Sequence, residues 1–296
     1  MSDYNELYEG TISISELRIK YGRTGFLKFL LRANYIKLMV RIARGINNKY
    51  TLKMKKMRYQ YLIPYLKLRD LIYILIFKRN MLPLNKQLHQ ILNNQKQAWS
   101  SHIYAGGYFY QGWLKIGIRG LRETNTRFTD YNISSYMSAD KTCLDIGSNN
   151  GFFALKLGEL NRSVDAIEFN PFLTDIGKAT AKYLNINNVN FIQGDFQEYK
   201  FKTRYDYIFS LANHKTGDKN LTLEMRQYLQ LIYDLMNVNG CLMFESHCTE
   251  AKNPKQFKQF IETFSDLFVI EQETSIKQYK INYIGDRLFY VLRKVG

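Results

Sequence analysis

Apolar residues follow two different patterns in this chain, and the change comes near residue 140. From there to residue 296, short apolar runs alternate with longer segments in which apolar residues recur every three or four positions. The runs predict strands, and the segments between them predict helices. The expected strands are 142–146, 163–168, 189–193, 205–210, 240–246, 267–273 and 287–293, and the expected helices are 150–160, 171–184, 221–237 and 254–266.

This alternation predicts the fold class. We expect an α/β fold with a seven-stranded, mostly parallel, doubly wound sheet, because each helix carries the chain back across one face of the sheet. The last two strands follow one another without a helix, so they should form an antiparallel hairpin at the sheet edge. A helical region is expected to precede the sheet.

The front of the chain has helical spacing. Apolar residues recur at helical intervals through 24–44, with basic residues between them. A Tyr/Leu/Ile-rich segment, 59–77, is interrupted by Pro64, and a polar helix is expected over 84–98. We therefore expect a basic helical accessory region over 1–100, a bridge and substrate lid rich in Gly, aromatic residues and Arg over 101–135, and a third domain over 136–296.

Charge is concentrated in the same front part. Residues 1–130 hold 23 Lys and Arg against seven Asp and Glu, which accounts for the whole net charge of +16. A compositional bias towards Lys would not remove acids from one region only. Such a field attracts phosphates, whether of nucleic acid, of lipid headgroups or of a nucleotide-linked substrate.

Other features narrow the class of protein. The polar, acidic start of the chain is unlike a secretory signal peptide. Its longest uncharged apolar run, 71–77, is too short to span a bilayer. The three cysteines show neither metal-binding spacing nor a disulfide framework, which favours a reducing compartment. We expect a cytoplasmic protein, with peripheral contact at the inner face of an anionic membrane as a further option.

The first expected strand runs into a glycine-containing turn, CLDIGSNNGFF, at residues 143–153. A strand, a turn and a helix in this order place backbone amides and a helix N-terminus beside a ligand at the carboxyl edge of the sheet. Gly147 and Gly151 let the chain turn tightly and let a ligand approach the backbone. The spacing differs from the G-x-G-x-x-G pattern of dinucleotide-binding oxidoreductases.

This turn resembles motif I of the class I, Rossmann-like S-adenosylmethionine-dependent methyltransferases. Asp145, Gly147 and Gly151 match that motif, while Asn149 replaces its middle glycine; asparagine tolerates a positive φ better than most residues. The resemblance covers about residues 140–296 and implies S-adenosylmethionine as cofactor. The turn contributes the first expected cofactor-binding residues: Asp145, Gly147, Ser148, Asn149, Gly151 and Phe152.

Later strand ends continue the resemblance. It implies that Glu168 accepts hydrogen bonds from the ribose hydroxyls, since a carboxylate offers two acceptor oxygens. It further implies that Asp195 accepts from the adenine amino group, that Phe196 lies against the ring, and that Ser210 lines the methionyl side. Taken singly, Glu168 could be a solvated charge, Asp195 a helix cap and Phe152 plain core. Their order and spacing together favour a methyltransferase.

Catalytic candidates lie just past the fourth and fifth strands. A hydroxyl acceptor needs a base, because an alcohol is a poor nucleophile until its proton leaves. We expect His214 to be that base, with Glu245 or His247 orienting it or serving instead. The alternatives are that these histidines only satisfy loop backbone groups, or that the three side chains gather around a divalent metal; we predict no metal.

The bridge supplies the expected substrate-binding residues Tyr110, Arg122 and Arg127, because an Arg fork suits a carboxylate or a phosphate. Three hypotheses remain for the front region. It could hold a glycan or lipid-linked saccharide acceptor at a membrane surface, which we favour for its many large apolar residues. It could bind RNA, most simply tRNA, through phosphates and stacked bases. It could also be an interaction module packed on the core or on a second subunit.

Overall fold

The computed structural model describes residues 53–103, 105–214, 222–245, 254–280 and 283–296. The chain divides into two compact units, one of residues 1–58 with 278–285 and one of residues 59–277 with 286–296. Of the smaller unit, only the start of one helix and the tips of two strands are described. The expected helical segment 24–44 lies outside the described residues. No described helix combines the length and the apolarity needed to cross a membrane.

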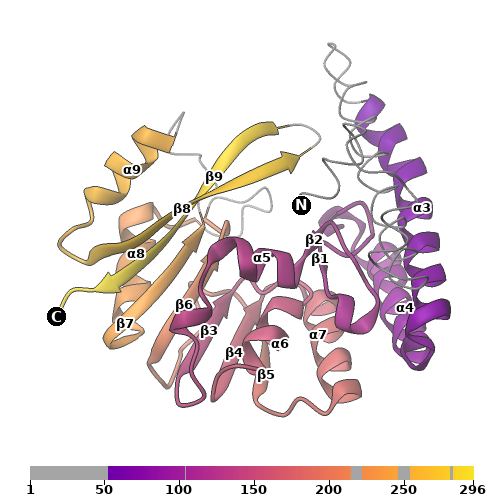
Figure 1. Ribbon diagram of the computed structural model, residues 1–296, viewed down its shortest axis with the longest axis horizontal. Coiled ribbons are helices and arrows are strands. Elements are labelled where there is room, and N and C mark those ends of the chain that lie inside the picture. Colours follow the sequence, from indigo (N-terminus) through magenta and orange to yellow (C-terminus); the bar gives the residue numbers. More distant parts are fainter. Residues whose placement is uncertain (1–52, 104, 215–221, 246–253, 281–282) are drawn as a thin grey trace, which may run out of the picture. The chain divides into compact units, whose positions relative to one another are not determined.

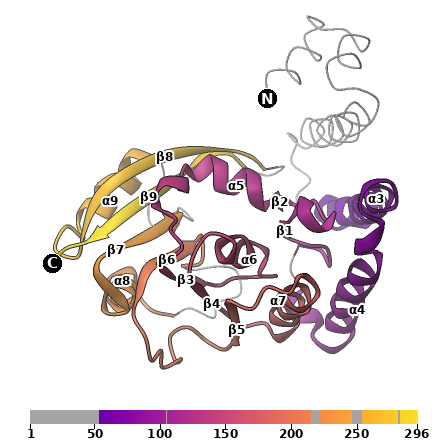
Figure 2. The ribbon, with the colours of Figure 1, turned by 60° about the horizontal axis from the view of Figure 1, so that its bottom comes forward.

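Two helices begin the described chain, α3 (Lys53–Phe77) and α4 (Leu82–Ala98), with a 3-10 turn, η1 (Arg79–Met81), between them. α3 continues through Pro64, where an interruption was expected. Pro64 is exposed, while Ile63 and Leu66 beside it are buried, so packing on both sides offsets the lost backbone hydrogen bond. α4 packs against α7 (Pro171–Leu184), as both ribbon views show (Figures 1 and 2).

The bridge contains several short regular elements. Its elements are η2 (Ser100–His102), β1 (Gln111–Gly112), η3 (Leu114–Ile116), β2 (Arg122–Glu123), α5 (Thr124–Tyr131) and η4 (Ser134–Tyr136). β1 and β2 pair in parallel as a small separate sheet. The side chain of Glu123 caps α5 by accepting from the backbone amide of Thr126, and Asn132 ends the helix at a positive φ of 53°.

Seven strands form the main sheet, in the order β5-β4-β3-β6-β7-β9-β8. Their bounds are β3 (Thr142–Ile146), β4 (Ser163–Glu168), β5 (Val189–Gln193), β6 (Tyr205–Leu211), β7 (Met236–Glu245), β8 (Phe268–Lys280) and β9 (Tyr283–Lys294). The pairs among β5, β4, β3, β6 and β7 are parallel, and β9 pairs antiparallel with β7. This confirms the expected fold class.

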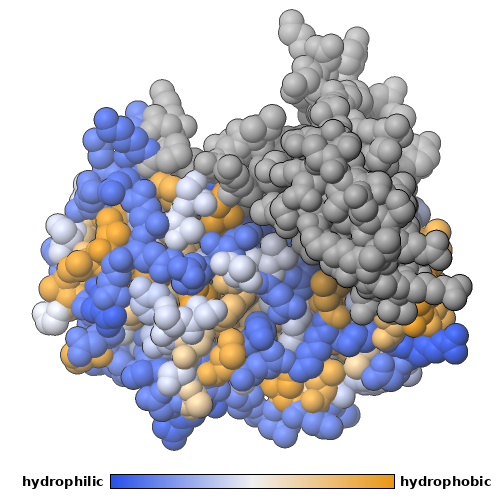
Figure 3. All heavy atoms as spheres, viewed as in Figure 1, coloured by the Kyte–Doolittle hydropathy of each residue, from blue (hydrophilic) through white to orange (hydrophobic). Residues whose placement is uncertain are grey.

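Helices cover both faces of this sheet. α6 (Phe152–Gly158) and α7 lie over β4 and β5 with α5 beside α6, while α8 (Met225–Asp234) packs on β7 and α9 (Pro254–Glu262) shares a hydrophobic core with it. α7 begins where the side chain of Asn170 accepts from the Phe172 amide at 3.1 Å, and Pro171 supplies its first residue. On the face drawn in Figure 3, hydrophobic and hydrophilic residues intermix over the described part of the chain.

Strand alternation decides which side chains meet on each face. In β7, Leu242 and Phe244 join the core under α8 and α9, so Glu245 points to the opposite face, where α5 and α6 lie. Asp145 in β3 lies on the α5 and α6 face for the same reason. In β9, Phe289 is on that face and stacks on Tyr131 of α5, with ring centroids 4.3 Å apart. The register pairs Glu245 of β7 with Phe289 of β9.

Candidate active site

The turn after β3 has the strained backbone that its sequence predicts. Gly147, Asn149 and Gly151 all have positive φ, at 64°, 53° and 75°. A β-carbon on Gly147 would lie 2.8 Å from Oδ1 of Asn213, and one on Gly151 would lie 2.4 Å from Cε1 of Phe191. Both positions therefore need glycine for close packing as well as for backbone shape. Asn149 adopts the left-handed conformation expected where the motif has a glycine.

Glu168 ends β4 and faces this turn. One of its carboxylate oxygens accepts from the backbone amide of Asn149 at 2.8 Å, and the other accepts from the amide of Asn170 at 2.9 Å. These two bonds fix the carboxylate at the carboxyl edge of the sheet.

Asp195 and Phe196 follow β5. Oδ1 of Asp195 accepts from the backbone amide of Gln197 at 2.9 Å, so the carboxylate also shapes its own turn. Phe196 is buried, and its ring meets Phe201 and Tyr228. Both residues also line a cavity. Asp195 and Phe196 thus combine a local structural role with exposure to that cavity.

The cavity lies at the carboxyl ends of four neighbouring parallel strands. Its walls include Gly147 after β3, Glu168 at the end of β4, Asp195 after β5 and Leu211 at the end of β6. The bridge closes it with Tyr110, Gln111 and Arg127. A ligand site outside the carboxyl ends of parallel strands is what a doubly wound sheet predicts.

Asp145 is buried in the wall of this cavity. Burial raises the pKa of its carboxyl to about 7, the charge of Glu168 adds to the rise, and Arg127 opposes it. Among the described residues, Oδ2 of Asp145 and Oδ1 of Asn149 have no hydrogen-bond partner. Unpaired buried acceptors are costly, so the cavity wall suits a ligand that brings hydrogen-bond donors.

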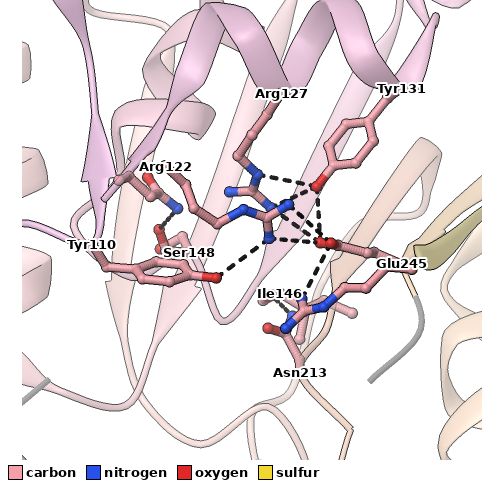
Figure 4. Close-up of polar contacts among 10 residues, drawn as sticks. Tyr110, Arg122, Arg127, Tyr131, Ile146, Ser148, Asn213 and Glu245 are labelled. Atoms are coloured by element: carbon pink, nitrogen blue, oxygen red, sulfur yellow. Dashed lines mark hydrogen bonds and ion pairs between the residues drawn. The ribbon is translucent and has the colours of Figure 1, made fainter. Parts of the chain in front are cut away.

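A second polar cluster, which we call the Glu245 cluster, adjoins the cavity (Figure 4). Its members are Tyr110, Arg122, Arg127, Tyr131, Glu245 and Arg287. Glu245 is buried and accepts from Arg122 at 3.0 Å and 3.2 Å, and from the hydroxyl of Tyr131 at 2.9 Å. Arg287 donates to it at 3.2 Å and Arg127 at 3.4 Å.

This cluster fixes the charge states of its members. Burial alone would protonate Glu245, but Arg122, Arg127 and Arg287 outweigh it and hold the pKa of that carboxyl far below its usual range. Burial likewise opposes ionisation of Tyr110, yet the charges of Arg122 and Arg127 lower the pKa of its phenol below the ordinary value. Glu245 is therefore a permanently ionised anchor, and Tyr110 presents a more acidic phenol to the cavity.

Three further predicted site residues, Phe152, Ser210 and His214, are described and are not part of the cavity lining. Ser210 is buried, with its hydroxyl 2.7 Å from that of Tyr228, and Phe152 is fully buried at the start of α6. His214 is buried too; its Nε2 lies 3.0 Å from the carbonyl oxygen of Leu223, and its ring lies 5.2 Å from that of Tyr228. His247 falls outside the described residues. No three His, Cys, Asp or Glu side chains in the described ranges are placed to hold a metal ion.

Sequence reasoning missed several polar residues of the site. Gln111 donates to the carbonyl oxygen of Ser148 at 3.0 Å and accepts from the amide of Phe153 at 3.0 Å, so it ties the bridge to the turn. Asn213 donates to the carbonyl oxygen of Ile146. Tyr131 and Arg287 complete the Glu245 cluster from α5 and β9. None of these belongs to a short motif, and only the fold brings them together.

Comparison with known proteins agrees with this geometry. Residues 137–283 match a family described as a methyltransferase domain. Over 78 residues, the chain is 31% identical to an uncharacterized protein of Methanocaldococcus jannaschii; the match spans 26% of this chain and 30% of the relative's length.

Among solved structures with similar folds, two examples match over nearly their whole length. One is the N-methyltransferase NodS of Bradyrhizobium japonicum in complex with S-adenosylhomocysteine (15% identity, TM-score 0.45), and the other is a methyltransferase of Pyrococcus furiosus (15% identity, TM-score 0.46). Each match covers 71% of this chain and 98% of the solved chain. A tRNA m1G37 methyltransferase of M. jannaschii is 14% identical over 57% of this chain and 49% of its own (TM-score 0.44).

The C-terminal part of this chain is therefore a class I, Rossmann-like methyltransferase domain, and its cofactor is S-adenosylmethionine. The site fits that cofactor on its own chemistry. The cavity offers carboxylates and unpaired acceptors to a ligand whose ribose hydroxyls and amino groups are donors. Bound there, S-adenosylmethionine supplies an already activated methyl group.

Proposed function

We propose that the protein transfers a methyl group from S-adenosylmethionine to a hydroxyl group of a glycan or lipid-linked saccharide. The observation that carries the methyl-transfer part is the cavity at the strand ends, where Glu168 is fixed by two backbone amides and Asp145 keeps an unpaired oxygen. Asp145, Gly147, Asn149, Glu168, Asp195 and Phe196 would hold the cofactor. Ser148, Gly151, Phe152 and Ser210 would support them from outside the cavity lining.

The protein's own groups would position the acceptor and take its proton. Alignment of the acceptor with the methyl group can supply much of the rate, and a closed cavity excludes water. His214 is the proposed base, and the contact of its Nε2 with the carbonyl oxygen of Leu223 orients the ring. Tyr110 is a second group that can take the proton, because nearby guanidinium groups favour its phenolate.

Glu245 has a different role in this proposal. It contacts three guanidinium groups and stays ionised, so we assign it to positioning Arg122 and Arg127. Kinetics can separate the two candidate bases, His214 and Tyr110. His214→Gln is expected to lower kcat by about a hundredfold, as for loss of a general base, with little change in affinity for S-adenosylhomocysteine. An unchanged kcat in His214→Gln together with a large loss in Tyr110→Phe would move the base to Tyr110.

The saccharide assignment is supported by the surface of α3. Leu68, Leu71, Ile72, Leu75 and Ile76 are exposed on this helix, next to a strongly basic part of the sequence. Large apolar side chains combined with positive charge suit an anionic membrane surface, where lipid-linked saccharides are found. RNA is the alternative acceptor, favoured by the charge excess of residues 1–130 alone.

One experiment separates these two acceptors. The full chain is tested for sedimentation with vesicles containing anionic lipid, for binding to bulk tRNA at several salt concentrations, and for methyl transfer into glycan and RNA pools. The saccharide proposal predicts vesicle binding and label in the glycan pool. Methyl label in the RNA pool, together with a tRNA affinity that falls steeply as salt rises, would make RNA the acceptor in place of the saccharide.

A further inference from the structure

The Glu245 cluster carries more positive than negative charge. Arg122, Arg127 and Arg287 all contact Glu245, and it is the one carboxylate that ion-pairs with them in the described chain. Exposure of these three side chains is 14%, 5% and 9%. Surplus buried charge is unfavourable unless a counter-charge arrives, so the cluster is matched to an anion.

The hydrogen bonds that these arginines make to described residues have few acceptors. Arg287 makes one, from Nη1 to Glu245. Arg122 uses both terminal nitrogens, to Glu245 and Tyr110. Each guanidinium group carries five N–H donors, which is more than these bonds to described residues use.

The position of the cluster separates its anion from the cofactor. Arg127 lines the cavity and feels the charge of Asp145, so it faces the cofactor side. Arg122 and Arg287 both donate to Oε1 of Glu245, and neither lines that cavity. Tyr110 joins the two places, because it lines the cavity and accepts from Arg122 at 3.3 Å. An anion held by Arg122 and Arg287 would therefore lie next to the site of methyl transfer.

We propose that Arg122 and Arg287 bind a carboxylate or phosphate group of the methyl acceptor, and that this protein consequently methylates an anionic substrate. This inference rests on the proposed methyl transfer and narrows its acceptor. An Arg pair held by a shared carboxylate is pre-organised for bidentate recognition of such a group. Glu245 fixes both guanidinium groups before the substrate arrives.

Calorimetry with simple anions tests this proposal without knowledge of the acceptor. The full chain is saturated with S-adenosylhomocysteine and titrated with inorganic phosphate and, separately, with acetate, at constant ionic strength. We expect binding of at least one of these anions. Arg287→Gln should weaken it about tenfold, the loss of a charged hydrogen bond, while affinity for S-adenosylhomocysteine changes less than twofold. The anion affinity of Arg287→Lys should lie between those of wild type and Arg287→Gln. Arg226→Gln, which removes an exposed charge from α8, should bind the anion as wild type does.

A second arm distinguishes the cofactor's own carboxylate as the bound anion. Methylthioadenosine has the adenosyl group but no amino acid carboxylate. If the anion binds to the methylthioadenosine complex but not to the S-adenosylhomocysteine complex, the cluster binds the cofactor's own carboxylate and the proposal is overturned. Equal anion affinity in Arg287→Gln and Arg226→Gln, or no anion binding by wild type, would also overturn the proposal. Failure of wild type to bind S-adenosylhomocysteine would contradict the proposed methyl transfer itself, and this inference with it.

Discussion

Two buried carboxylates on the same face of the sheet have opposite preferences for a proton. Burial and the charge of Glu168 oppose ionisation of Asp145 and raise the pKa of its carboxyl to about 7. Glu245 is as deeply buried, but three guanidinium groups keep it ionised. Their surroundings set this difference, and each carboxylate yields a separate prediction.

Glu245→Gln should destabilise the protein strongly. The substitution keeps the shape of the side chain but leaves Arg122, Arg127 and Arg287 buried without their counter-charge. We expect a loss of about 3–5 kcal/mol in the free energy of unfolding, measured by urea denaturation. Glu271→Gln is the matched control, because its pair with Arg293 is partly exposed and should contribute less than about 1 kcal/mol. Equal losses in the two variants would contradict the anchoring role.

Asp145→Asn should remove a pH dependence of stability in the cofactor-free protein. The folded-state pKa of Asp145, about 7, lies above its ordinary value of 3.8, so its contribution to stability is fully present below about pH 4 and is lost as pH rises to 7. The free energy of unfolding of wild type should therefore fall relative to Asp145→Asn between about pH 4 and 7, by at most about 1.4 kcal/mol per pH unit, and level off above pH 7. A pH-independent difference would show that the pKa is not raised.

At the scale of elements, the bridge forms one side of the site. Gln111 of β1 and Asn150 of the turn form two hydrogen bonds. The backbone amide of Gln111 donates to Oδ1 of Asn150 at 3.3 Å, and Nδ2 of Asn150 donates to the backbone carbonyl of Gln111 at 3.1 Å. The Gln111 side chain also accepts from the first turn of α6. The short strand β1 therefore fixes the turn after β3 in place at the wall of the cavity.

Gln111→Ala should loosen this junction. It removes the acceptor for the Phe153 amide and the donor to the Ser148 carbonyl, so we expect affinity for S-adenosylhomocysteine to fall about tenfold, at about 1.4 kcal/mol, with a small drop in melting temperature. Calorimetry and thermal unfolding measure the two effects. Gln90→Ala, on an exposed face of α4, is the control and should change neither.

Periodicity predicted the parallel strands and failed at the bridge for a physical reason. The expected strands 142–146, 163–168 and 189–193 coincide with β3, β4 and β5, because buried strands are continuous apolar runs. The bridge elements are two to eight residues long and depend on tertiary contacts, which have no sequence period. Arg287 was missed similarly, since only the register of β9 against β7 brings it to Glu245.

At the scale of the whole molecule, charge and chemistry are divided along the chain. The net charge lies in residues 1–130, while the residues proposed to hold the cofactor come from the carboxyl ends of strands after residue 140. The boundaries 1–100, 101–135 and 136–296 stay predictions. Tyr110, Arg122 and Arg127 connect the parts, because the bridge contributes them to the cofactor cavity and the Glu245 cluster.

Calorimetric titration of the full chain with S-adenosylhomocysteine measures whether the cavity at the strand ends binds the cofactor. We expect one binding site per chain and a loss of at least about tenfold in affinity for Glu168→Gln, whose carboxylate is fixed at the cavity edge. Glu198→Gln, which changes an exposed residue after β5, should bind as wild type does. Absence of binding by wild type, or equal affinity in Glu168→Gln, would show that this cavity is not the cofactor site.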